Sequence, residues 1–195
     1  MDHKADSAPA QRRLYVSMIL SLDGYIEGPG HELDWFADDN PQFVRYADEM
    51  LDSVGVAIYG RKAYDVMIQH WPDAEANARS AEDLAFAQRM NALPKVVLSR
   101  TLPHATWNNT RVVRDVEAIA ALKREPGKPI VAWAGAELVA TLLAHHLVDE
   151  IRLVIVPVVL GGGTPMFRTG MRLRQVRTQS LGGDHAVLCY EPIQR

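Results

Sequence analysis

The chain has 195 residues, 48% of them hydrophobic, and its 21 Lys and Arg side chains against 24 Asp and Glu give a formal net charge of −3. This length suits one well-buried core, and no linker divides the sequence into two domains. Because no basic stripe or run of like charge is present, we expect no nucleic-acid partner.

The beginning of the chain is polar and rich in alanine. We expect residues 1–12 to form a flexible leader and residues 13–195 to form one domain. No hydrophobic run reaches the roughly 18 residues that a membrane-spanning helix requires, so we expect no membrane partner. The single cysteine, Cys189, lies in an apolar run and cannot form an intramolecular disulfide. Together these features favour a cytoplasmic protein.

The first half of the fold is predicted from short apolar runs that alternate with segments of helical periodicity. In chain order these are a strand at 14–20, a helix at 40–54, a strand at 56–59, a helix at 61–69, a helix at 80–91 and a strand at 95–99. Asn40 and Pro41 suit the N-cap and the first position of the first helix. Pro72 stops the second helix.

The second half begins with the same alternation and ends with consecutive strands. In chain order these are a strand at 111–113, a helix at 116–124, a strand at 130–134, a helix from Gly135, a strand at 150–160 that contains Pro157, and a hairpin of 172–181 and 185–193. This order predicts an α/β fold with a mostly parallel sheet and an antiparallel C-terminal hairpin.

Two junctions between a strand and a helix carry glycine, in IYGRKAY and WAGAEL. Gly60 and Gly135 leave the first N–H groups of a helix open to an anion. Arg61 and Lys62 add two positive charges at the first junction. Ligands bind outside the carboxyl ends of the strands in open α/β sheets, so both junctions are expected to face one ligand. The alternative for each junction alone is a plain turn with solvated cations.

A third junction, VLSRTL, offers Ser99 and Arg100. A hydroxyl beside a guanidinium suits a terminal phosphate such as the 2′-phosphate of NADP. The three junctions together suit a dinucleotide that carries an extra phosphate.

Five blocks of the sequence resemble the dihydrofolate-reductase-like superfamily and, within it, the reductase (C-terminal) domain family of the bifunctional deaminase-reductase of riboflavin biosynthesis. The blocks are MILSLDGYI, IYGRKAYDVM, KVVLSRTL, VAWAGAELVATLLAHHLVDEIRLVIVPVVLGGGTPMF and the closing hairpin. The resemblance extends from Leu14 to Pro192. It implies a single-domain, three-layer fold with a mostly parallel mixed sheet between helices on both faces, NADPH as the cofactor, and a homodimer.

The resemblance also implies which residues bind the cofactor. These are Met18, Ile19, Gly60, Arg61, Lys62, Tyr64, Leu98, Ser99, Arg100, Gly135, Ala136, Glu137 and Leu138. In this match the backbone of Met18 and Ile19 faces the nicotinamide. Residues 98–100 lie along the adenosine and its 2′-phosphate, and residues 135–138 lie at the pyrophosphate.

The substrate side is marked less clearly. The helix at 40–54 lacks the inward carboxylate with which dihydrofolate reductases hold the pterin ring, so folate is disfavoured as the substrate. Its inward face is predicted to consist of Phe43, Val44, Ala47, Met50 and Leu51. Asp23 and Asp34 are candidate proton donors, with water as the alternative, although a turn role for the first and a capping role for the second compete. Trp35 and Trp133 are predicted to line the substrate cavity.

No metal site is predicted. His145 and His146 are adjacent, and neighbouring helical residues point about 100° apart, so they do not share one ion. The GGG at 161–163 has no lysine after it and is interpreted as a flexible turn at the rim of a cleft.

The sequence therefore predicts an NADPH-dependent oxidoreductase that transfers hydride to a C=N or C=O of a small polar heterocycle, pteridine- or aminopyrimidine-like. The alternative is a module that binds NADP(H) without turnover. A formed cavity lined by Asp34, Trp35 and Trp133 favours the enzyme, whereas a collapsed one favours the module.

Overall fold

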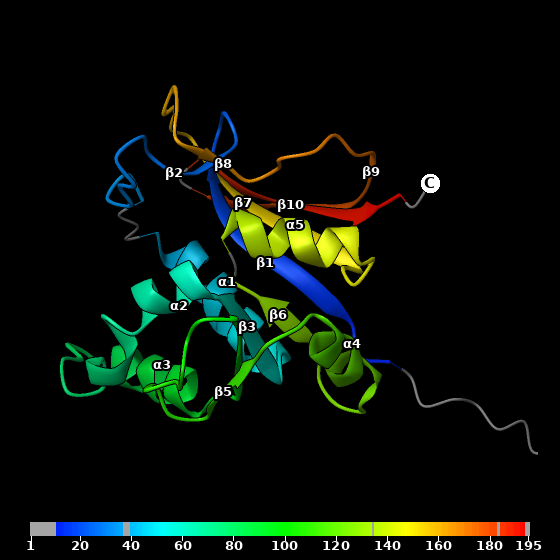
Figure 1. Ribbon diagram of the computed structural model, residues 1–195. Coiled ribbons are helices and arrows are strands. Elements are labelled where there is room, and N and C mark those ends of the chain that lie inside the picture. Colours follow the sequence, from blue (N-terminus) through cyan, green and yellow to red (C-terminus); the bar gives the residue numbers. More distant parts are fainter. Residues whose placement is uncertain (1–10, 37–39, 134, 183, 194–195) are drawn as a thin grey trace, which may run out of the picture.

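An eight-stranded sheet forms the middle of the protein in the computed structural model, which describes residues 11–36, 40–133, 135–182 and 184–193. The strands run in the order β5-β4-β3-β6-β1-β7-β10-β9 (Figure 1). They are β1 (Leu14–Ser21), β3 (Val56–Gly60), β4 (Lys95–Leu98), β5 (Thr110–Val113), β6 (Ile130–Ala132), β7 (Glu150–Val156), β9 (Leu173–Gly182) and β10 (His185–Pro192). Neighbours from β5 to β7 are parallel, whereas β10 is antiparallel to β7 and β9. The predicted mixed α/β sheet with a C-terminal hairpin is confirmed.

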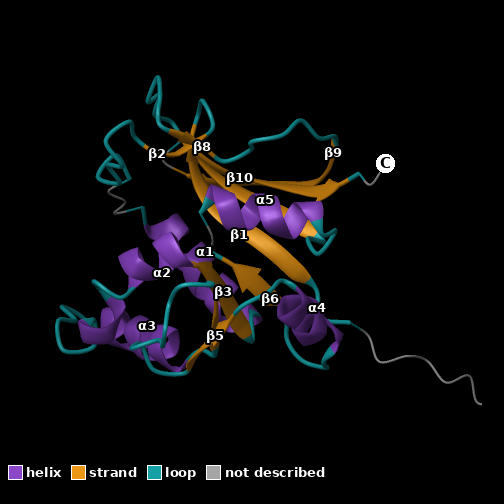
Figure 2. Cartoon of the chain, viewed as in Figure 1, coloured by secondary structure: helices purple, strands orange, loops and turns teal. Residues whose placement is uncertain are grey.

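Helices cover both faces of this sheet, which gives three layers (Figure 2). They are α1 (Pro41–Ser53), α2 (Arg61–Met67), the 3₁₀ helix η1 (Trp71–Asp73), α3 (Ala81–Ala92), α4 (Glu117–Arg124) and α5 (Ala136–Ala144). Side chains of α1, α2 and α3 pack on one face, and those of α4 and α5 pack on the other. Within the described ranges, no helix has the length and apolar character needed to cross a bilayer.

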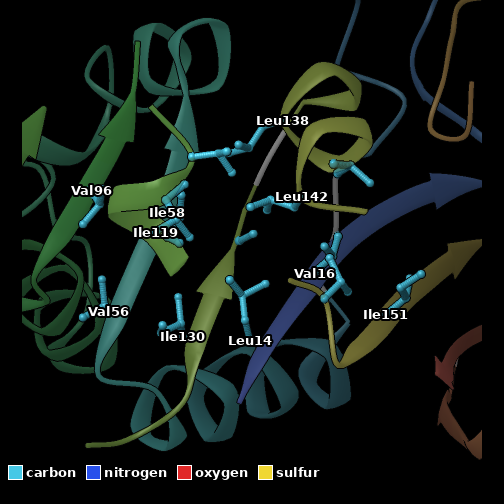
Figure 3. Packing of buried hydrophobic residues seen from close by; sticks show 14 of the residues in the cluster. Leu14, Val16, Val56, Ile58, Val96, Ile119, Ile130, Leu138, Leu142 and Ile151 are labelled. Atoms are coloured by element: carbon cyan, nitrogen blue, oxygen red, sulfur yellow. The ribbon is translucent and has the colours of Figure 1, made fainter. Parts of the chain in front are cut away.

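Alternate side chains of β1 point to opposite layers. Leu14 and Val16 pack against α4 and α5 in one buried cluster that includes Leu142 (Figure 3). Tyr15 packs on the other face with side chains of α1, α2 and α3. A strand covered on both faces reads as a continuous apolar run, and each fully buried aliphatic side chain contributes roughly 1.5–3 kcal/mol. The central strands therefore hold the two helical layers together.

Side-chain caps fix the starts of α1 and α3. The Asn40 side-chain oxygen accepts hydrogen bonds from the backbone N–H groups of Gln42 at 2.9 Å and Phe43 at 3.4 Å. The Ser80 hydroxyl accepts from the N–H of Asp83 at 3.0 Å. Such caps satisfy N–H groups that have no partner within the helix. Both helices begin where the sequence predicts.

Some predicted boundaries are wrong. The strand predicted at 150–160 ends at Val156, because Pro157 has no N–H with which to continue the ladder. The helix predicted at 61–69 ends at Met67. Arg12, assigned to the leader, is buried, and its Nε donates to the carbonyl of Lys128 at 2.7 Å. Residues 1–10 of the predicted leader lie outside the described part of the chain.

A second, two-stranded sheet was not predicted. It pairs β2 (Tyr25–Glu27) with β8 (Thr164–Pro165), which directly follows the GGG turn. Gly163 has a φ of +127°, and a Cβ there would lie 2.0 Å from the carbonyl oxygen of Glu27. Glycine is therefore required for the close approach of these two segments. The GGG turn, which the sequence suggested to be simply flexible, has a specific packing role.

Candidate active site

A cavity of about 480 Å³ opens at the carboxyl ends of β1, β3 and β6. Its walls come from the second half of β1, from α1, from the starts of α2 and α5, and from the segment around β2 and residues 33–36. Most of the lining is apolar or aromatic, with a few polar groups. Cavities of this size and character accommodate small organic ligands.

Most of the predicted site residues line this cavity. From the predicted cofactor set these are Met18, Ile19, Gly60, Arg61, Lys62, Gly135, Ala136, Glu137 and Leu138, and from the predicted substrate set Trp35 and Trp133. The fold brings them together from four separate segments of the chain. The cavity beside the two tryptophans is formed and not collapsed.

The two glycine junctions are neighbours in the cavity wall. A Cβ at Gly60 would lie 3.4 Å from the Cβ of Leu138, so the start of α2 lies next to the first turn of α5. A Cβ at Gly135 would meet no described atom within 4 Å, so the space in front of α5 is open. Neither helix has a side-chain cap among the described residues. One ligand can therefore reach both junctions.

Two cations lie at the open start of α5, and a third lies at the start of α2. Lys62 Nζ and Arg168 Nη2 each lie 3.9 Å from Glu137 Oε1. Arg61 Nε donates to the carboxylate of Asp65 at 2.7 Å. Exposed pairs of this kind contribute only about 0–1 kcal/mol. The three cations can consequently exchange their carboxylate partners for an anionic ligand at little cost.

Four predicted cofactor residues lie outside the cavity lining: Tyr64, Leu98, Ser99 and Arg100. Tyr64 is only 1% exposed. Its hydroxyl accepts hydrogen bonds from the backbone N–H groups of Thr106 at 2.9 Å and Trp107 at 3.1 Å. The structure therefore gives Tyr64 the role of fixing a loop, which differs from the role that the resemblance implies.

The third junction is next to the first in the sheet, since Leu98 of β4 pairs with Gly60 of β3. The Ser99 hydroxyl is buried and accepts from the N–H groups of Thr101 at 3.3 Å and Leu102 at 3.1 Å, so its oxygen holds a turn. Arg100 is exposed. Of the predicted pair, the guanidinium is thus the group that is available to a phosphate.

The two predicted proton donors also lie outside the cavity lining. Asp23 accepts hydrogen bonds from the backbone N–H groups of Leu160 at 3.2 Å and Gly161 at 2.8 Å. Its hydrogen bond with the Ser21 hydroxyl and these two backbone bonds hold the pKa of Asp23 below its ordinary value. Asp23 is therefore an ionised acceptor that ties two loops together. Asp34 is exposed to solvent.

Comparison with known proteins identifies the family. The family model of the RibD C-terminal domain matches residues 12–187. The chain belongs to the RibD C-terminal domain family. The Bacillus subtilis protein YyaP, itself uncharacterized, is 34% identical over 180 residues, which cover 88% of this chain and 92% of YyaP.

Solved structures share the fold of this RibD C-terminal domain. A Shewanella sp. PV-4 protein whose name assigns it to riboflavin biosynthesis superposes with a TM-score of 0.68 at 20% identity, over 93% of this chain and 99% of that one. Dihydrofolate reductase from Enterococcus faecalis, solved with NADP(H), superposes with a TM-score of 0.66 at 16% identity, over 94% of this chain and 98% of that one. The predicted dihydrofolate-reductase-like fold is confirmed.

The α1 wall of this family member carries no carboxylate. Asp48 pairs with Arg89 of α3, and Asp52 lies 2.6 Å from the same guanidinium. Both acids thus join α1 to α3 and do not line the cavity. The wall consists of Phe43, Tyr46 and Met50.

The predicted inward face of α1 is wrong in one respect. Val44 is half exposed, whereas Tyr46 is buried and lines the cavity. Residues 43, 46 and 50 follow the i, i+3, i+7 spacing of one helical face, so this spacing could have identified the tyrosine. Its phenol, unlike a valine side chain, brings a polar group to the wall.

Glu27 is a cavity residue that the sequence reasoning missed. Its Oε1 accepts from the Thr164 hydroxyl at 2.5 Å and lies 2.8 Å from His31 Nδ1. Burial acts to raise the pKa of Glu27, but the bonds with Thr164 and His31 and the charges of His31 and Lys62 outweigh it and lower the pKa. No three His, Cys, Asp or Glu side chains converge as metal ligands in the described ranges.

Proposed function

We propose that this protein is an NADPH-dependent reductase that transfers hydride to a C=N or C=O of a small polar heterocycle, pteridine- or aminopyrimidine-like. The observation that carries the proposal is the formed cavity, which joins a cationic wall at the starts of α2 and α5 to an aromatic wall at α1. The Enterococcus faecalis dihydrofolate reductase, which has the same fold, holds NADP(H).

The residues present fit NADPH. The open space at Gly135 admits a pyrophosphate next to the start of α5, with Lys62 and Arg168 beside it. Arg61 and the exposed Arg100 are the proposed ligands of the 2′-phosphate, because a guanidinium binds phosphate oxygens in pairs. The backbone of Met18 and Ile19 remains the proposed contact of the nicotinamide.

The cofactor, when bound, supplies the hydride, and the chain orients the two rings and keeps water away from them. Trp35 and Trp133 are the proposed ring contacts on the substrate side. Asp23 and Asp34 lie outside the cavity, and Glu27 has a lowered pKa that keeps it ionised. We therefore favour water as the source of the proton.

The alternative function, binding of NADP(H) without turnover, requires no space for a substrate beside the cofactor. The formed aromatic compartment around Phe43, Tyr46 and Met50 supports the enzyme over that alternative. A screen of NADPH oxidation with pteridines and aminopyrimidines separates the two. Turnover of at least one such compound supports the reductase, and tight NADPH binding without any turnover supports the module.

The cofactor assignment is tested by titrating the protein with NADPH and NADH. We expect NADPH to bind at least about tenfold more tightly, and Arg61→Ala and Arg100→Ala each to remove about tenfold of that preference. Arg111→Ala, which removes an exposed charge from β5 at the edge of the sheet, is the matched control and should change neither affinity. Failure of the wild-type protein to bind NADPH removes the reductase proposal.

We also propose a homodimer. The strand β9 forms one edge of the main sheet and, within the described ranges, pairs only with β10. Its side chain Val176 is 45% exposed. Sedimentation should give about twice the chain mass of 21.7 kDa, and Val176→Glu should shift the protein towards the monomer. Sedimentation of the wild-type protein as a monomer contradicts this proposal.

A further inference from the structure

Two side chains with a hydroxyl group line the cavity, and one of these hydroxyls has no hydrogen-bond partner in the described part of the chain. Ser17 and Tyr46 both line the cavity and are only 5% and 6% exposed. Among the described residues the Tyr46 hydroxyl is buried without a partner, and Ser17 places its side chain in the lining of the same cavity. Buried polar groups in native proteins are nearly always paired, so unpaired ones at a cavity indicate a missing ligand group.

The Tyr46 hydroxyl is not needed for packing. Tyr64 provides the contrast, since its buried hydroxyl accepts two backbone hydrogen bonds and so holds a loop. The ring of Tyr46 packs with Val154 and Cys189, contacts that phenylalanine would make equally well. An unpaired buried hydroxyl lowers the free energy of unfolding relative to that phenylalanine. The hydroxyl therefore serves something other than stability.

A third donor lies next to these two hydroxyls. Arg152 is paired in register with Ser17 on one side and with Cys189 on the other, so the three side chains lie on the same face of the sheet. Its Nε donates to Glu150 at 2.6 Å, and its guanidinium lies 3.7 Å from the centre of the Tyr15 ring. Arginine has no acceptor to offer. Arg152 thus adds only N–H donors beside the two hydroxyls.

The carboxylate next to Arg152 and two of the carboxylates on α1 are already paired with arginine. Glu150 is engaged by Arg152 and by Arg13, whereas Asp48 and Asp52 are engaged by Arg89. Burial raises the pKa of Tyr46 to about 12, so the phenol keeps its proton at ordinary pH. Each hydroxyl at this end of the cavity therefore has an O–H to donate, next to the N–H groups of Arg152.

We propose that Ser17 and Tyr46 donate hydrogen bonds to an acceptor oxygen of the substrate, a carbonyl or a carboxylate, at the end of the cavity next to Arg152. This inference rests on the proposed function and names the polarity of the substrate end that binds next to α1. A ligand that presents an amidinium or a diamino edge would place N–H groups opposite the N–H groups of Arg152, so it is disfavoured there.

Two probes with the same ring system and opposite polarity test the inference. 2-Naphthoate presents acceptors only, and 2-naphthamidine presents donors only. We expect the wild-type protein to bind 2-naphthoate at least about tenfold more tightly, measured by calorimetry. Tyr46→Phe and Ser17→Ala should each weaken 2-naphthoate binding by about tenfold and leave the affinity for NADPH unchanged.

Tyr59→Phe is the matched control. The Tyr59 hydroxyl is likewise buried without a partner, but Tyr59 does not line the cavity. Both phenylalanine variants should keep or raise the melting temperature, and only Tyr46→Phe should lose affinity for 2-naphthoate. This combination of unchanged stability and lost binding separates a ligand contact from a structural role.

Several outcomes overturn the inference. They are tighter binding of 2-naphthamidine, no measurable binding of 2-naphthoate, binding of 2-naphthoate that neither variant weakens, and an equal loss in Tyr59→Phe. A lower melting temperature of Tyr46→Phe also overturns it, because the hydroxyl would then have a structural partner. The proposed function is tested separately, since it fails when NADPH does not bind, whatever the two probes do.

Discussion

The two walls of the cavity are built in different ways. The wall at the starts of α2 and α5 is made of glycine backbone and exposed cations, and Gly60 lies next to Leu138 in it. The wall at α1 is made of large side chains, and its polar character depends on the hydroxyl of Tyr46. A substitution changes a side chain and leaves the backbone groups in place. A wall of backbone therefore suits the constant part of a ligand, whereas one substitution can alter a wall of side chains. The first is accordingly the wall that we assign to the cofactor.

The largest expected effect is a loss of NADPH affinity when the space at the start of α5 is filled without a change in the fold. Gly135→Val puts a branched side chain into open space in front of α5, where a Cβ meets no described atom within 4 Å. We expect a loss of about 100-fold in NADPH affinity with an unchanged melting temperature. Gly170→Val, at another glycine with open space, should change neither quantity. An equal loss in both variants contradicts the assignment of the wall.

The next effect is on stability alone. Tyr64→Phe leaves the N–H groups of Thr106 and Trp107 without their acceptor, which should cost about 1–3 kcal/mol in the free energy of unfolding. Chemical denaturation measures this cost, and the NADPH affinity of the folded variant should stay at the wild-type value. A selective loss of NADPH affinity with full stability would return Tyr64 to the cofactor set.

Low pH should weaken the contact between β2 and β8, whose residues Glu27 and Thr164 line the cavity. Because the folded-state pKa of Glu27 lies below its ordinary value of 4.5, its ionised form stabilises the contact between β2 and β8, and this stabilisation is lost as the pH falls through the lowered pKa. The fluorescence of Trp35 should therefore change below about pH 4.5 in the wild-type protein. Glu27→Gln should abolish this transition, and Glu49→Gln on α1 should preserve it. A transition that persists in Glu27→Gln contradicts the role of this carboxylate.

The smallest effect concerns the charges of the backbone wall. Asp65 lies 2.7 Å from the Arg61 guanidinium and competes with an incoming phosphate. Asp65→Asn should therefore raise the NADPH affinity by about two- to threefold, as expected for removal of an exposed ion pair. Titration at low and high salt measures it, and the gain should shrink at high salt. A loss of affinity would show that Asp65 orients Arg61 instead of competing with the ligand.

The sequence predicted the residues of the glycine and cation wall better than those of the α1 wall, for a physical reason. Gly60, Arg61 and Lys62 are contiguous, so the local sequence pattern predicts both the end of the strand and the charges next to it. Tyr64 and Ser99 belong to the same patterns, yet their hydroxyls are occupied by loop N–H groups that only the fold brings to them. The lack of a partner at Tyr46 depends on the packing of α1 against distant strands. No spacing along the chain encodes it.

The most direct test of the central claim is to locate the nicotinamide of bound NADPH relative to the tryptophans. Energy transfer from tryptophan to bound NADPH depends steeply on distance, and Trp133 lines the cavity whereas Trp71 does not. We predict that NADPH bound to the wild-type protein shows tryptophan-sensitised emission, that Trp133→Phe strongly reduces it, and that Trp71→Phe leaves most of it. Binding of NADPH with no such emission, or emission that survives in Trp133→Phe and disappears in Trp71→Phe, would contradict a nicotinamide between the two walls.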